Sequence, residues 1–115
     1  MIRLWKALIN SINGLGWALR YETAVREEVI AFALCFPASF FVAKTLAWWL
    51  ALVGSLLVLI VVELLNTAVE KLSDHVTPEH SQAIKVVKDL GSAAVLLALT
   101  LAFLVWGSAL AIWFW

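Results

Sequence analysis

Three stretches of the chain are almost free of charged side chains, and their lengths predict helices that cross a membrane. The runs Thr45 to Val62 and Leu90 to Trp115 contain no Asp, Glu, Lys or Arg. Both approach or exceed the roughly 20 residues that a helix needs to cross a bilayer. The run Val29 to Ala43 is shorter, but the charged end of Lys44 can reach toward water, so we interpret this run as a third crossing.

Apolar and polar residues separate onto two faces over the first dozen residues, a pattern typical of a helix that lies in the membrane surface. The apolar face consists of Ile2, Trp5, Ile9 and Ile12, and the polar face of Arg3, Lys6, Asn10 and Asn13. We expect Gly14 and Gly16 to loosen or end this helix, because glycine is conformationally free.

These patterns predict a single all-α integral membrane domain over residues 1–115. It consists of an N-terminal amphipathic surface helix at about 1–20 and three transmembrane helices at about 24–44, 46–74 and 78–113. Pro37 is expected to kink the first crossing. Thr77, followed by Pro78, is expected to cap the start of the last helix.

Composition and charge agree with this class. The chain is 64% hydrophobic and only 14% charged, which lies outside the range of soluble domains. Its eight basic and eight acidic residues form no basic cluster, so no nucleic-acid partner is indicated. All basic residues except Lys44 lie before the first crossing or between the second and third, which predicts a cytoplasmic N-terminus and an external C-terminus.

Tryptophan positions predict the same orientation independently. Trp48 and Trp49 begin the second crossing and Trp113 and Trp115 end the third, which places both pairs at the outer interface, where indole rings prefer to lie. The single cysteine, Cys35, lies in an apolar helix and permits no intramolecular disulfide.

One polar stripe interrupts the second crossing. At 100° per residue its members lie within about 80° of one another on a helix. Measured from Trp49 at about 1.5 Å per residue, Glu63 lies about 21 Å deep and Glu70 about 32 Å, against a hydrocarbon thickness of about 30 Å. The stripe therefore runs from inside the membrane to the cytoplasmic water, and its members are Glu63, Asn66, Glu70 and Asp74.

A carboxylate at the depth of Glu63 costs several kcal/mol unless it is paired, hydrated or protonated, which makes this residue a candidate for function. The simpler explanation is a hydrogen bond between helices with Glu63 neutral. Packing does not require a stripe that continues into water, so we favour a functional site.

More charged residues enter the membrane at the same inner edge. Carboxylates bind hard cations such as Mg²⁺, and Lys pairs with phosphate. Each residue alone is more simply a solvated helix end, but together they predict a site for a divalent cation and an anionic ligand. They are Glu22, Arg26 and Glu28 before the first crossing, and Lys88 and Asp89 before the third.

Other motifs carry less information. The small residues of "GSAAV", which begins at Gly91, indicate close helix packing. No glycine-rich phosphate loop and no HRD or DFG motif of a soluble kinase is present.

The stripe and the segment after it carry a resemblance. "VELLNTAVEKLSD" followed by "KDLGSAAVLLALTLA" resembles the prokaryotic diacylglycerol kinase family, and the similarity extends through "YETAVREE" back to "RLWKA". The motif E-x-L-N-[ST]-A-x-E, with K-D about 18 residues on, is specific to these small membrane enzymes, which are unrelated to the soluble kinases.

The resemblance implies a homotrimer in the bacterial inner membrane, with a periplasmic C-terminus and active sites shared between subunits. It implies transfer of the γ-phosphoryl group of ATP, with Mg²⁺, to the hydroxyl of diacylglycerol, giving phosphatidic acid. Glu63 matches the general base, and Glu22 and Glu70 match the metal ligands. Nucleotide contacts are implied for Arg3, Asn10, Glu22, Glu70, Glu79, His80, Ser81, Lys88 and Asp89. Supporting polar roles are implied for Asn66, Asp74 and Glu28, and lipid contacts for Arg3, Arg26, Trp49, Ser92 and Trp106.

The match departs from the family at two places. Asn10 stands where familiar members have Tyr, and His80 and Ser81 replace Tyr-His after Glu79, so we expect looser nucleotide selectivity. Undecaprenol kinase, the sister activity in the family, is the first alternative, although "KDLGSAAV" favours diacylglycerol. A small oligomeric ion transporter with Glu63 as its ion site is the more distant alternative.

Overall fold

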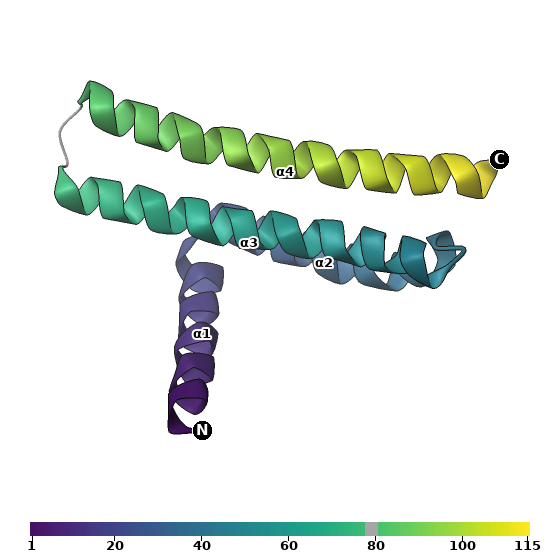
Figure 1. Ribbon diagram of the computed structural model, residues 1–115, viewed down its shortest axis with the longest axis horizontal. Helices are drawn as coiled ribbons and strands as arrows, with labels where there is room; N and C mark the ends of the chain where they lie inside the picture. Colours follow the sequence, from purple (N-terminus) through teal and green to yellow (C-terminus); the bar gives the residue numbers. More distant parts are fainter. Residues whose placement is uncertain (78–80) are drawn as a thin grey trace.

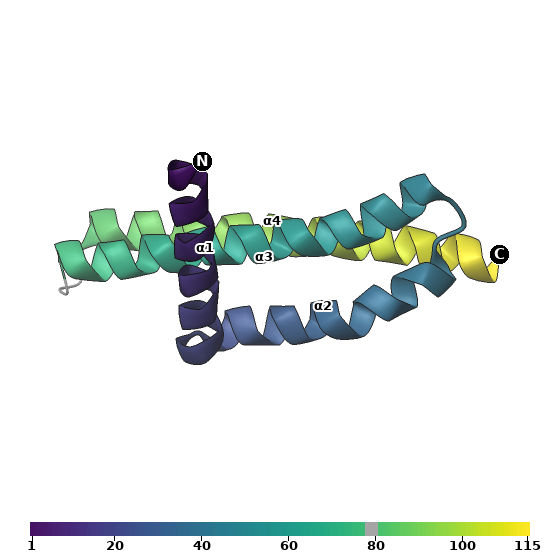
Figure 2. The same ribbon diagram turned by 90° about the horizontal axis from the view of Figure 1, so that it is seen from below.

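The computed structural model describes residues 1–77 and 81–115, which form four α-helices (Figure 1). Helix α1 spans Ile2–Tyr21, α2 Thr23–Val42, α3 Leu46–Val76 and α4 Gln82–Phe114. Helices α3 and α4 lie side by side and antiparallel, and α2 packs along α3 (Figure 1). Figure 2 shows that α1 runs across the long axis of the other three helices. This arrangement is the one expected for a surface helix beside a bundle that crosses a membrane.

A set of polar contacts holds α3 and α4 in one register. The indole Nε1 of Trp106 on α4 donates a hydrogen bond of 3.1 Å to the backbone carbonyl of Leu52 on α3. Near the C-terminus of α4, Lys44 Nζ, from the segment just before α3, donates to the carbonyl of Ile112 at 3.1 Å. At the opposite end of the pair, Lys88 Nζ lies 2.6 Å from Asp74 Oδ1. Contacts at both ends and in the middle therefore fix which residues of the two helices face each other.

Helices α3 and α4 are the two in the described part of the chain that are long and apolar enough to cross a membrane. Only 28% and 17% of their most apolar windows are buried within the chain. A core helix of a soluble protein would be mostly buried, so this exposure is the one expected of membrane-spanning helices. Helix α2 fails the same criterion because Arg26, Glu27 and Glu28 lie in its first two turns, and its crossing remains a prediction.

The structure corrects three local predictions. Helix α1 continues through Gly14 and Gly16 to Tyr21, because a glycine costs a helix only about 1 kcal/mol relative to alanine. The last helix begins at Gln82 rather than at 78, and Ser81 is its N-cap, with Oγ accepting from the Ile84 amide at 3.1 Å.

Thr77, predicted to be that N-cap, instead ends α3, where its amide donates to the Ser73 carbonyl at 3.1 Å. Pro78 lies outside the described residues. Pro37 lies inside α2, and this helix bends along its length (Figure 2). Proline removes a hydrogen bond from the helix interior, so the bend has the predicted cause.

Candidate functional site

Glu63 is the centre of a group of acidic side chains contributed by α2, α3 and the junction between α1 and α2. Its side chain faces into the bundle, and the residue is only 7% exposed. Glu28 of α2 lies close enough for the two carboxyl groups to repel each other electrostatically, and Glu22 and Glu70 act on Glu63 in the same way. One Glu28 oxygen, Oε2, is buried and has no hydrogen-bond partner among the described residues. Such a group is costly in a poorly hydrated place unless a cation or a proton neutralises it.

Asn66 lies one turn beyond Glu63 on the same face of α3 and is also buried, at 9% exposure. Its Nδ2 donates to Glu70 Oε1 at 3.4 Å, which is long for a hydrogen bond but joins residues one helical turn apart. Two members of the predicted stripe, Asn66 and Glu70, therefore contact each other along α3.

At the end of the stripe, Asp74 meets Lys88 of α4. Asp74 is about 42 Å along α3 from Leu46, farther than a hydrocarbon thickness of about 30 Å, so we expect this pair to lie in the aqueous layer. The hydrogen bond from Lys88 lowers the pKa of Asp74, and the positive charges of Lys88 and Lys71 act in the same direction. Asp89, which like Lys88 is implied to contact the nucleotide, has its carboxylate 2.7 Å from Lys85 Nζ. Of these two adjacent residues, Lys88 therefore contacts α3, whereas Asp89 contacts a residue of its own helix, α4.

Glu22 is placed by the junction between α1 and α2. It adopts an extended backbone conformation that ends one helix and starts the next, and its amide donates to the Ala18 carbonyl at 2.8 Å. Its carboxylate Oε1 lies 3.1 Å from Lys71 Nζ of α3. The junction therefore places the carboxylate of Glu22 against α3, beside the residue that follows Glu70.

Lys71 is a residue of this region that the sequence analysis did not select. Besides the ion pair with Glu22, its ammonium lies 5.7 Å from the ring centre of Trp17 on α1. It thus joins α1, the α1–α2 junction and α3. Its position directly after Glu70 was the available signal, but the contact depends on where α1 crosses α3, which spacing along the chain does not reveal.

Other predicted site residues lie elsewhere or have other contacts. Arg26 donates to the carbonyls of Leu19 and Arg20 at 3.0 and 3.2 Å, so its guanidinium caps the end of α1. Arg3 and Asn10 are exposed on α1, a helix whose N-terminal end points away from the other three helices (Figure 1).

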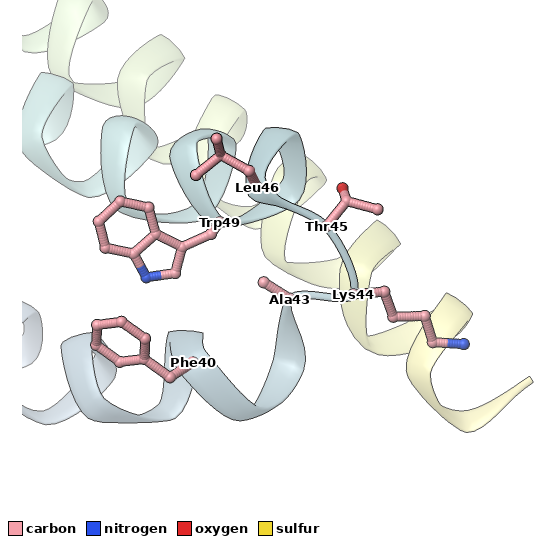
Figure 3. Close-up of a pocket in the computed structure, with 6 residues that line it drawn as sticks. All are labelled: Phe40, Ala43, Lys44, Thr45, Leu46 and Trp49. Atoms are coloured by element: carbon pink, nitrogen blue, oxygen red, sulfur yellow. The ribbon is translucent and has the colours of Figure 1, made fainter.

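The predicted lipid-contact residues are distributed along the helices. Ser92 is exposed on α4, and Trp106 makes the Leu52 contact described above. Trp49 is near the start of α3, where its ring lies 5.4 Å from that of Phe40 (Figure 3). This position is at the opposite end of the bundle from Asp74. Glu79 and His80 lie outside the described residues, and Ser81 caps α4.

Two carboxylates near Glu63 could serve as ligands of a metal ion. Within the described residues, no three acidic, His or Cys side chains are arranged to hold a metal ion by themselves. Magnesium in phosphoryl-transfer sites is held by one or two carboxylates, with waters and substrate phosphates completing the shell. Glu22 and Glu70 are both half-buried and lie within electrostatic range of Glu63, so they are the carboxylates that could take this role.

The helices and the acidic side chains together define a helical membrane protein with a polar site where α3 leaves the apolar layer. Comparison with known proteins identifies the family. Residues 9–110 match the prokaryotic diacylglycerol kinase family, and the chain belongs to it.

Relatives in several bacteria are similar over most of their lengths. A diacylglycerol kinase of Haemophilus influenzae is 36% identical over 100 residues, covering 87% of this chain and 85% of the relative. A diacylglycerol kinase of Helicobacter pylori is 37% identical over 105 residues, covering 91% and 82%. The Escherichia coli K12 diacylglycerol kinase is 34% identical over 112 residues, covering 90% and 85%. The resemblance noted in the sequence is thereby confirmed at the level of the family.

Proposed function

We propose that this protein is a bacterial membrane kinase that transfers the γ-phosphoryl group of ATP to the hydroxyl of diacylglycerol, giving phosphatidic acid. Membership of the prokaryotic diacylglycerol kinase family is the observation that carries the activity. The buried carboxyl group of Glu63, at the inner end of an apolar helix, supports the placement of the reaction.

We assign Glu63 as the general base. The lipid hydroxyl oxygen attacks the γ-phosphorus, its proton passes to Glu63, and the bond from the γ-phosphorus to the β-bridging oxygen breaks to release ADP. In phosphoryl transfer the protein mainly aligns the two substrates and neutralises the charge on the phosphates. The hydroxyl of the lipid acceptor lies just inside the hydrocarbon boundary. A base at the depth proposed for Glu63 could therefore reach it.

We assign Glu22 and Glu70 to Mg²⁺, which would neutralise the charge on the phosphates of ATP. These two carboxylates come from different elements and both act electrostatically on Glu63, which supports a shared site. Lys88 would move from Asp74 to a phosphate oxygen, because both partners are anions and the pair is solvent-accessible.

The remaining assignments concern assembly and topology. We propose that α2 crosses the membrane as a third helix, since it packs along α3, with the N-terminus in the cytoplasm and the C-terminus in the periplasm. We also propose a homotrimer with shared sites. Large apolar residues such as Phe41, Phe103 and Leu34 are 78%, 74% and 72% exposed in the single chain, which supports burial by lipid or by other subunits.

The acceptor is tested by supplying purified protein in mixed micelles with MgATP and either diacylglycerol or undecaprenol. We expect phosphatidic acid to form at a rate well above that of undecaprenyl phosphate. A faster reaction with undecaprenol would assign the sister activity. Ion flux in liposomes without phosphorylation of either lipid would favour the transporter.

Removing the charge of Lys88 tests the nucleotide assignment. A hydrogen bond to a charged group contributes about 1.5–3 kcal/mol, so Lys88→Met is expected to raise KM for MgATP by roughly 10- to 150-fold. The KM for diacylglycerol should change little. Lys85→Met is the matched control, since Lys85 also lies on the first turns of α4 and pairs with a carboxylate. Equal effects of the two substitutions would contradict a specific role for Lys88.

A further inference from the structure

Gly91 is the one glycine of the chain whose missing side chain leaves room for another residue. A Cβ atom placed on Gly91 would collide with Oδ1 of Asn66 and lie 3.3 Å from Cγ of the same side chain. At each of the other four glycines, Gly14, Gly16, Gly54 and Gly107, an added Cβ would meet nothing within 4 Å. The bare backbone of α4 at Gly91 is therefore what accommodates Asn66.

The orientation of the Asn66 amide follows from its second contact. A carboxylate only accepts hydrogen bonds, so the amide nitrogen must face Glu70, where Nδ2 lies 3.4 Å from Oε1. The oxygen is then directed toward Gly91, and it is buried without a partner among the described residues. Asn66 is thus held between α4 and Glu70.

The space around Asn66 allows it to be displaced without separating the helices. A groove of about 190 Å³ runs along the α3–α4 contact at this level. It is lined by Val62, Leu65, Asn66, Val69, Gly91 and Ala94. A methyl group at position 91 would push the Asn66 side chain into this groove and away from Glu70.

We propose that Gly91 is a positioning residue of the active site, which acts through Asn66 to hold the carboxylate of Glu70 in place. This proposal rests on the function proposed above, in which Glu70 binds the metal of the metal–nucleotide complex. It gives the glycine of "GSAAV" a role beyond close helix packing. Outer-shell partners of metal ligands typically contribute 10–100-fold in metal affinity or activity.

The test compares Gly91→Ala with Gly107→Ala in the purified full-length protein. Both substitutions add one methyl group to the same helix and raise its helix propensity equally, but only the first meets Asn66. Binding of Mn²⁺ in the presence of a non-hydrolysable ATP analogue is followed by the loss of the free Mn²⁺ resonance signal beyond the loss that the analogue causes without protein. We expect Gly91→Ala to weaken Mn²⁺ binding about tenfold or more, and Gly107→Ala to leave it unchanged.

Asn66→Ala supplies the second arm, because it removes the side chain that Gly91 accommodates. If Gly91 acts only through Asn66, the double variant Asn66→Ala/Gly91→Ala should bind Mn²⁺ and unfold as Asn66→Ala does. This arm remains decisive if Gly91→Ala alone fails to fold.

Three results would overturn the proposal: unchanged Mn²⁺ binding in Gly91→Ala, a further loss when Gly91→Ala is added to Asn66→Ala, or no Mn²⁺ binding by the wild type. Wild-type protein that binds Mn²⁺ but phosphorylates no lipid would contradict the proposed function alone.

Discussion

Replacing Glu63 with Gln is expected to reduce the rate of lipid phosphorylation by about 10²- to 10⁴-fold, the range that a positioned general base contributes. Glutamine has nearly the same shape but cannot accept the proton of the lipid hydroxyl. Because Glu63 is surrounded by other carboxyl groups, loss of its charge should not destabilise the fold. The measurement is kcat in mixed micelles, together with the thermal unfolding temperature and the affinity for a non-hydrolysable ATP analogue.

Glu27→Gln is the matched control for this substitution. Glu27 is adjacent in sequence to Glu28 but is exposed on α2, and it has no assigned role. We expect its kcat to remain within about twofold of the wild type, as for most surface substitutions. A Glu63→Gln protein that retains full turnover, or one that loses nucleotide binding to the same extent as turnover, would contradict the assignment of Glu63 as base.

Replacing Glu70 or Glu22 with Gln is expected to raise the Mg²⁺ concentration for half-maximal activity by about tenfold or more, and chelation of divalent cations is expected to abolish activity. Each substitution removes one of the two carboxylates assigned to the metal. The measurement is initial rate against free Mg²⁺ at fixed ATP. High Mg²⁺ should restore part of the lost rate, which it cannot do for Glu63→Gln.

The ion pair between Glu22 and Lys71 allows a metal-binding role of Glu22 to be distinguished from a structural role. Lys71 is largely exposed although Glu22 is half-buried, and loss of such an ion pair at the surface costs about 1 kcal/mol. Glu22→Gln should therefore unfold at nearly the wild-type temperature while its Mg²⁺ dependence changes strongly. A large fall in unfolding temperature with normal Mg²⁺ dependence would make Glu22 a structural residue instead.

The helices could be predicted because they depend on properties that repeat along the chain. Apolar runs and a two-faced N-terminal segment correspond to α1, α3 and α4 within a few residues. The ends of the helices were predicted less well. Thr77 and Ser81 are both good capping residues, and the choice between them depends on where α3 stops rather than on local propensity.

The site could be predicted along one helix but not between helices. Spacing of one turn places Glu63, Asn66 and Glu70 on one face, and Asn66 and Glu70 contact each other there. Contacts across helices depend on register and crossing angle, which a period of 3.6 residues does not determine. For this reason Lys71 was missed, and the approach of Gly91 to Asn66 became visible only in the folded chain.

Sidedness of lipid labelling tests most directly the claim that a lipid alcohol and dissolved ATP meet at the cytoplasmic end of α3. ATP labelled at the γ-phosphate is added to sealed bacterial membrane vesicles that contain the protein, either inverted or right-side-out. We expect labelled phosphatidic acid in inverted vesicles, and almost none in right-side-out vesicles until they are permeabilised. Labelled lipid in intact right-side-out vesicles, or no labelled lipid in either kind, would contradict the account.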